Sequence, residues 1–174
     1  KSKLLIFLIN DNSLKWLIVY ISFKLINSYI FILPTHINSQ QITTLKKKFK
    51  PNFVFKKNKI YKINNNSNDF EKIAKQKNIK IYKSYIYDIL FTTGSASEPK
   101  GVCIEEKAYI YTAKNLIKIL KQNENDCELL SMSFSHSFGL TRLRCCLITG
   151  QKIYITDGLK NFPEIYLNKK IVKY

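Results

Sequence analysis

Arginine is almost absent from this 174-residue sequence, in which only Arg142 and Arg144 occur among 29 basic residues. The other 27 are lysines, and with 25 isoleucines and 16 asparagines they make up 68 residues. Because all three residue types have AT-rich codons, drift in base composition accounts for the net charge of +17. The arginine forks and aromatic motifs that read nucleic acids are missing. Specific nucleic-acid binding is therefore disfavoured, and a basic nucleic-acid-binding module is kept as an alternative hypothesis.

The four cysteines lack the paired C-x-x-C spacing that prepares a tetrahedral zinc site, so no metal centre is predicted. They are Cys103, Cys127, Cys145 and Cys146. Because this spacing gives no disulfide framework, the four are expected to be buried thiols of a reduced, cytoplasmic protein.

A long uninterrupted apolar run is also missing. The apolar run 4–9 is shorter than the about 7 to 15 residues of a signal peptide's apolar region. The stretch 14–33 is interrupted by Lys15, Lys24 and Asn27, and a lysine near a bilayer centre costs about 2.5 to 3.5 kcal/mol. We therefore expect no membrane insertion and place both stretches in a protein core.

Methionine occurs once, at Met132, and the sequence begins at Lys1, so we expect a fragment of a longer protein. The length suits one domain, and with 45% hydrophobic and 13% aromatic residues the chain has ample material for a core.

Short apolar runs alternate with stretches of helical periodicity, which predicts an α/β fold with a largely parallel sheet. The polar segment 56–69 is expected to be a surface loop. Strands are predicted at 3–9, 28–33, 52–55, 79–82, 85–91, 129–134 and 152–155, and helices at 14–26, 39–49, 70–77, 108–121 and 140–147.

We expect Asn12 or Ser13 to be the N-cap of the first predicted helix, and Ser39 to be the N-cap of the second. In the first helix, apolar residues recur at spacings of three and four and so share one face, as expected of a helix in a soluble core. They are Leu14, Leu17, Ile18, Ile21 and Leu25.

One segment of the sequence has the residues of a phosphate-binding loop. Residues 92–101 (TTGSASEPKG) gather hydroxyl side chains around a glycine and close with Pro-Lys-Gly. Glycines let backbone amides approach an anion, hydroxyls donate hydrogen bonds, and the lysine adds positive charge, so the segment suits phosphate. It is not a Walker loop, because its lysine precedes the second glycine. A plain turn is the alternative. The candidate phosphate ligands are Thr92, Thr93, Gly94, Ser95, Ser97, Lys100 and Gly101.

This segment resembles the phosphate loop of the adenylate-forming enzymes, which include acyl-CoA synthetases, luciferases and peptide-synthetase adenylation domains, and it departs from the family's fixed places only at Ala96. The segment 12–20 resembles the family's early N-S-x-E-W helix, and 29–34 resembles the strand ending in proline that follows it. Residues 134–140 are similar to the family's aromatic-x-His-x-x-Gly segment. The resemblance runs from about residue 4 to 157, which identifies residues 1–174 as part of the family's large N-terminal domain, without the C-terminal domain.

The resemblance implies that a carboxylate attacks the α-phosphorus of ATP, releasing pyrophosphate and leaving an acyl-adenylate. The thiol of coenzyme A, or of the phosphopantetheine of a carrier protein, then captures the acyl group. The segment 92–101 would hold the leaving phosphates, with magnesium sharing their charge. His136 would lie beside the substrate carboxylate and the α-phosphate. Ser135, Phe138 and Gly139 are expected to touch the near end of a small carboxylic acid, and a place in the core is the alternative for Phe138.

Two departures argue against a fully active chain. Ala96 removes a hydroxyl, and Glu106 stands where many members carry histidine, although Glu105 and Glu106 also suit the start of a helix. Beyond Ile155 the family's Y-G-x-T-E and T-G-D segments and the domain with the catalytic lysine are missing. We therefore expect the chain alone not to form adenylate at a useful rate. A non-catalytic remnant of the ligase fold stays open.

Overall fold

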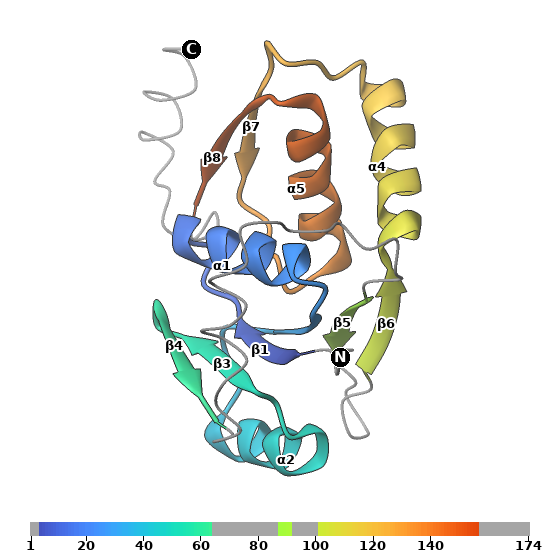
Figure 1. The fold of residues 1–174 in the computed structure, drawn as a ribbon. Coiled ribbons are helices and arrows are strands. Elements are labelled where there is room, and N and C mark those ends of the chain that lie inside the picture. The colour runs from blue at the N-terminus through green and yellow to red at the C-terminus, as the bar shows by residue number, and fades with distance from the viewer. Residues whose placement is uncertain (1–3, 64–86, 92–100, 157–174) are drawn as a thin grey trace.

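The computed structural model describes residues 4–63, 87–91 and 101–156 of the chain. The predicted helix 70–77, the predicted strand 79–82 and the motif residues 92–100 lie outside this part. Two units meet around a central helix (Figure 1). The elements are β1 (Leu5–Ile9), α1 (Leu14–Leu25), β2 (Tyr29–Leu33), α2 (Ser39–Phe49), β3 (Phe53–Lys56), β4 (Lys59–Lys62), β5 (Tyr87–Phe91), β6 (Gly101–Glu105), α4 (Glu106–Leu120), β7 (Cys127–Leu130), α5 (Ser137–Thr149) and β8 (Lys152–Ile155).

The larger sheet has the strand order β4-β3-β1-β2-β5-β6, in which β3, β1, β2 and β5 are parallel. The two edge strands run antiparallel to their neighbours, β4 to β3 and β6 to β5. The predicted α/β class with a largely parallel sheet is confirmed. Helices α1 and α2 cover opposite faces of this sheet (Figure 1), because right-handed crossovers between parallel strands place successive helices on the side dictated by strand order.

The side chains of β1 alternate between these two faces. Ile6 and Leu8 join the cluster beneath α1, whereas Phe7 and Ile9 join the cluster that contains Ile42 of α2. A strand buried on both faces reads as a continuous apolar run, which is why the sequence predicted this strand without an alternating pattern.

Helix α1 begins after Ser13, whose Oγ accepts a hydrogen bond from the backbone N–H of Trp16 at 3.0 Å. The predicted apolar face was only partly right, because Leu17 is buried and Ile21 packs against the core but the other three residues do not. Leu14, Ile18 and Leu25 are 64%, 55% and 49% exposed. The buried face consists of Trp16, Leu17, Val19, Tyr20 and Phe23.

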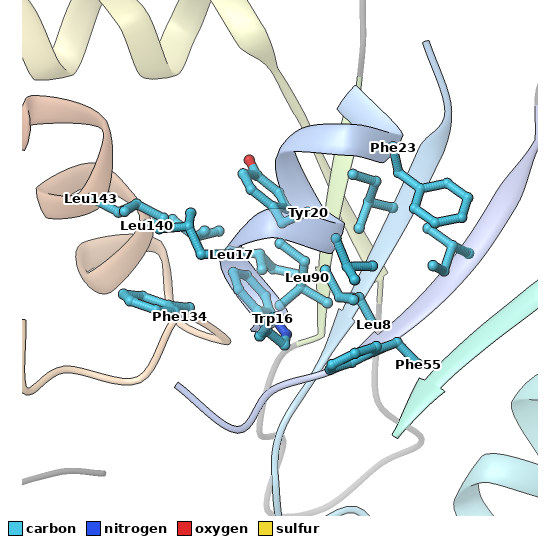
Figure 2. Close-up of a cluster of buried hydrophobic side chains, with 14 of the residues drawn as sticks. Leu8, Trp16, Leu17, Tyr20, Phe23, Phe55, Leu90, Phe134, Leu140 and Leu143 are labelled. Carbon is cyan, nitrogen blue, oxygen red and sulfur yellow. The ribbon is translucent and has the colours of Figure 1, made fainter. Parts of the chain in front are cut away.

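The error has a physical reason. Apolar residues occur all around α1, so periodicity alone allowed more than one apolar face. The face that carries the three aromatic rings offers the larger apolar area, and it is the one that is buried. Trp16 stacks on Tyr20 and meets Phe134, with ring centroids 5.2 Å apart in both pairs, and Figure 2 shows this contact joining α1 to the segment before α5.

Helix α2 has the predicted range, but its cap is Asn38 and not Ser39. Asn38 Oδ1 accepts from the backbone N–H of Gln41 at 2.8 Å, while Gln41 Oε1 accepts from the backbone N–H of Asn38 at 3.1 Å. This reciprocal capping box satisfies two N–H groups at once, which a serine one residue later does not do.

The expected surface loop 56–69 contains a strand. β4 pairs with β3 through a tight turn at Lys57 and Asn58, which both have positive φ (49° and 59°). Two consecutive residues with positive φ match the twist of a two-residue hairpin. The side chains of β4 are exposed, so β4 lacks the apolar pattern that would have predicted a strand at the edge of the sheet.

The strand β6 was missed, and the helix after it begins at Glu106 rather than at residue 108. β6 is a short edge strand whose first three residues are exposed, so it lacks an apolar pattern and depends on pairing with β5.

The second unit is the parallel pair β7–β8 with helices α4 and α5 beside it (Figure 1). β8 was predicted correctly. The predicted strand 129–134 is shorter and earlier, at Cys127–Leu130, because Phe134 belongs to a turn that inserts its ring into the core. The predicted helix 140–147 extends to Ser137–Thr149.

The cysteine prediction was half wrong. Cys145 and Cys146 are buried in α5, but Cys103 on β6 and Cys127 on β7 are exposed, and all four are free. Cys103 lies in the exposed first part of β6, and Cys127 is the exposed first residue of β7. The sequence does not mark either position as outward-facing. In the described residues, no helix is both long and apolar enough to cross a bilayer.

Candidate functional site

The carboxyl ends of the parallel strands form one edge of the sheet. Ile9 at the end of β1 pairs with Leu33 of β2, and Ile32 pairs with Leu90 of β5. Phe91 therefore lies level with Leu33, about 10 Å from Ile9 across two strand spacings. The motif that begins at Thr92 thus starts at the same edge as the residues that follow β1, the edge at which open α/β sheets bind ligands.

The two ends of the motif are held side by side. Phe91 pairs with Gly101 across the antiparallel strands β5 and β6, so the chain leaves and re-enters the sheet at neighbouring positions. Of the predicted phosphate ligands, only Gly101 lies in the described residues. A Cβ at Gly101 would come within 3.1 Å of Ile89 Cγ2, a tight contact that favours glycine at this position.

Asn12, the residue before the N-cap of α1, is the centre of a hydrogen-bond network. Its Nδ2 donates to the carbonyl of Met132 at 3.1 Å and to that of Thr156 at 3.2 Å. Its Oδ1 accepts from Asn10 Nδ2 at 2.8 Å and from the backbone N–H of Phe134 at 3.1 Å. One buried amide thus joins the end of β1 to the turn 131–136 and to the residue after β8.

Asn10 adds a second link to the same turn. Its Nδ2 also donates to Ser133 Oγ at 2.9 Å, and Ser133 Oγ lies 2.7 Å from Ser135 Oγ. The backbone carbonyl of Asn10 accepts from Thr35 Oγ1 at 2.6 Å. Because these donors and acceptors are satisfied within the protein, they fix the backbone of the turn 131–136.

His136 ends this turn and is the N-cap residue of α5. Its side chain is exposed and makes no capping hydrogen bond. Its backbone N–H donates to the Ser133 carbonyl at 3.2 Å, and its carbonyl accepts from the Leu140 N–H at 3.2 Å. The imidazole therefore stands on a fixed backbone at the positive end of a 13-residue helix.

The three predicted substrate-contact residues have different surroundings. Phe138 is 55% exposed, whereas Ser135 is 6% exposed and its hydroxyl faces Ser133. Gly139 packs directly on the turn, where an added Cβ would lie 2.3 Å from the Ser133 carbonyl oxygen. The glycine of the aromatic-x-His-x-x-Gly segment is thus required so that α5 can approach the turn that carries His136.

Glu106 opens α4 and contacts two cations. Its Oε2 lies 2.5 Å from Lys24 Nζ, and its Oε1 lies 3.5 Å from Arg144 Nε.

Burial alone would lower the pKa of Arg144, but the tyrosine and carboxylate neighbours raise it above its usual range. Burial, with Asp88 adding to it, also raises the pKa of Tyr20 well above its usual value.

No group of three His, Cys, Asp or Glu side chains in the described ranges could hold a metal ion by itself.

Sequence reasoning missed the role of Asn10 and Asn12. Asn12 was considered as a helix cap and as the first residue of the segment 12–20, and its distant partners lie 120 residues or more along the chain. The available signal was position, because polar residues directly after a buried parallel strand stand at the ligand-binding edge.

The chain matches a known protein family over nearly its whole length: the family model described as AMP-binding enzyme covers residues 5–173. A 2-succinylbenzoate–CoA ligase from Geobacillus sp. (strain WCH70) is 30% identical over 102 residues, which are 55% of this chain and 21% of that protein.

Solved structures of low identity share the fold. The O-succinylbenzoate coenzyme A synthetase of Bacillus subtilis in complex with AMP has a TM-score of 0.74 at 16% identity, covering 99% of this chain and 47% of that one. ATP-bound MatB from Rhodopseudomonas palustris has a TM-score of 0.78 at 10% identity, covering 99% and 38% respectively. The chain therefore spans less than half the length of these relatives.

Proposed function

Because the chain belongs to the family of AMP-binding enzymes, we propose that it takes part in the ATP-dependent activation of a carboxylic acid as an acyl-adenylate. A carboxylate oxygen attacks the α-phosphorus, the bond between the α-phosphorus and the bridging oxygen breaks, and pyrophosphate leaves. Coenzyme A or a carrier's phosphopantetheine then supplies the thiol that displaces AMP and forms a thioester.

The observation that supports this proposal is that β5, which precedes one motif segment, ends at the same edge of the sheet as the turn that carries His136. β5 ends at Phe91, directly before the motif 92–101, and Asn10 and Asn12 fix the turn that ends in His136 at the carboxyl end of β1. These two segments are distant in sequence, and the reaction needs both a pyrophosphate site and a group beside the α-phosphate.

The segment 92–101 supplies the phosphate-binding groups. Hydroxyls of Thr92, Thr93, Ser95 and Ser97, backbone amides near Gly94 and Gly101, and the charge of Lys100 would bind the β- and γ-phosphates and stabilise the leaving pyrophosphate. Magnesium, when bound, shares the phosphate charge.

His136 would orient the substrate carboxylate near the α-phosphate. Its exposed ring and the positive end of α5 suit two negatively charged groups. Of the three residues expected near the substrate, we propose direct contact for the exposed Phe138. Ser135 and Gly139 would act by holding the turn.

A titration of the 174-residue chain with pyrophosphate and with magnesium-ATP tests the proposal. Lys100→Ala and Thr93→Ala are each expected to weaken binding about 10-fold or more, because a hydrogen bond to a charged group contributes about 1.5 to 3 kcal/mol. Lys118→Ala removes the same charge from an exposed site on α4 and serves as the control. We expect little or no adenylate from this chain, and ready exchange of pyrophosphate into ATP would contradict that expectation.

Equal weakening by Lys100→Ala and Lys118→Ala would mean that the +17 chain attracts polyanions without a site. Tight binding of duplex DNA that falls steeply with salt would favour the nucleic-acid-binding alternative. Absence of ATP and pyrophosphate binding would favour the non-catalytic remnant.

A further inference from the structure

Four charged side chains meet in the interior between the two units of the fold. Asp88 on β5 is fully buried, and its two oxygens are 2.9 Å from Lys24 Nζ and 2.5 Å from Arg144 Nη2. Glu106 contacts the same two cations from the other side. Two carboxylates thus share two cations, and the charges of this cluster balance.

Two tyrosines complete the cluster. The hydroxyl of Tyr20 donates to Asp88 Oδ2 at 2.7 Å and also accepts from Arg144. The ring of Tyr109 lies 3.7 Å from the guanidinium carbon of Arg144, a close cation–π contact. Figure 2 shows the Tyr20 hydroxyl directed out of the apolar cluster, towards the side where α4 and α5 lie.

The cluster joins α1 to the elements that border the two motif segments. Asp88 stands three residues before Phe91, the last residue of β5, and Glu106 directly follows β6. Arg144 lies on α5, the helix that begins at His136, and Arg144 Nη1 also donates to the carbonyl of Leu140.

We propose that Lys24, Asp88, Glu106 and Arg144 are positioning residues that fix the β5–β6 pair relative to helix α5. The inference rests on the proposed function, in which His136 and the motif between β5 and β6 act on one nucleotide. A buried carboxylate is tolerated only when its charge is matched, and here the match requires α1, α4, β5 and α5 together. A shift of α5 relative to β5 would leave Asp88 buried without its guanidinium.

The same helix offers a matched control. Arg142 lies two residues before Arg144, and it makes a bidentate contact with Glu128 on β7, at 2.8 Å and 2.5 Å. This pair is also largely buried, but it joins α5 to β7 and not to β5. Removal of either arginine charge disturbs α5, and only removal of Arg144 releases β5.

The experiment compares Asp88→Asn, Arg144→Met and Arg142→Met in the 174-residue chain, at a temperature where urea titration shows each to be folded. Glu106→Gln, at the more exposed end of the cluster, replaces Asp88→Asn or Arg144→Met if that variant does not fold. One readout is amide hydrogen exchange in β5 and β6, corrected for the global stability of each variant. The other is the affinity for magnesium-ATP.

Asp88→Asn and Arg144→Met are expected to speed the corrected exchange in β5 and β6 at least 10-fold and to weaken ATP binding at least 10-fold. Arg142→Met is expected to change either value less than 2-fold. Equal effects of Arg142→Met and Arg144→Met, or unchanged exchange in Arg144→Met, would overturn the inference. If the unchanged chain binds no ATP, the proposed function fails, and the exchange data alone then decide whether the cluster holds β5–β6 in place.

Discussion

Substitution of Gly139 by alanine is the sharpest test of how the His136 turn is built. The new Cβ would lie 2.3 Å from the Ser133 carbonyl oxygen and 2.9 Å from its carbonyl carbon. Both neighbours are backbone atoms, so neither can rotate away as a flexible side chain does. The turn and α5 must separate, and we expect the free energy of unfolding to fall by about 1 to 3 kcal/mol, as in other overpacked sites.

Gly150→Ala provides the matched control. Gly150 has φ +76° and no atom within 4 Å of an added Cβ, so alanine there is strained but meets no neighbour. Its expected cost of about 1 to 2 kcal/mol is similar, but it arises at the opposite end of α5. The two variants should therefore differ at the His136 turn rather than in stability.

Urea unfolding and the imidazole NMR signals measure both effects. The sequence contains only two histidines, so His36→Gln assigns the signal of His136. Gly139→Ala should shift the His136 signal, and Gly150→Ala should leave it in place. A Gly139→Ala protein with wild-type stability and an unshifted His136 signal would refute the close packing of α5 on the turn.

Three further predictions follow from burial. A thiol reagent should label the exposed Cys103 and Cys127 in the folded chain and spare Cys146, and labelling of all four thiols before unfolding would contradict the burial of α5. Burial raises the pKa of Cys146 from 9.0 to about 12, so the unfolded chain loses this proton first as the pH rises. The free energy of unfolding should therefore fall between about pH 9 and 12, and urea titrations should show a smaller fall in Cys146→Ala. Trp16→Ala should lower the free energy of unfolding by about 3 to 5 kcal/mol, and Leu14→Ala by less than about 0.5 kcal/mol. If urea unfolding gave the reverse order, the buried face of α1 would be the one predicted from periodicity.

In the proposed reaction, some residues contact the ligands and others hold those residues in position. The motif residues 92–101 and His136 provide groups that would contact phosphates and carboxylate. Asn10 and Asn12 contact no phosphate in this proposal, yet their hydrogen bonds fix the turn that carries His136. Such supporting contacts keep a site in one geometry before its ligand arrives.

The sequence by itself determined those features that depend on neighbouring residues. β1, α1, β2, α2 and β8 were predicted within a residue or two, because apolar runs, capping residues and prolines act over a few positions. The motif 92–101 and the segment around His136 could be recognised in the sequence because each is a contiguous run, and the roles of their residues stay predictions. The family resemblance on those runs is confirmed by the match over residues 5–173.

Only the tertiary structure decided which surfaces meet. The buried face of α1, the pairing of β6 with β5, and the ion pairs of Glu106 all depend on partners that local patterns do not specify. Asn12 bonds to Thr156 across 144 positions, and Arg144 meets Tyr20 across 124. An amide or a guanidinium looks the same in sequence whether it faces water or a buried partner, and the free energy that distinguishes the two comes from burial, which exists only once the chain has folded.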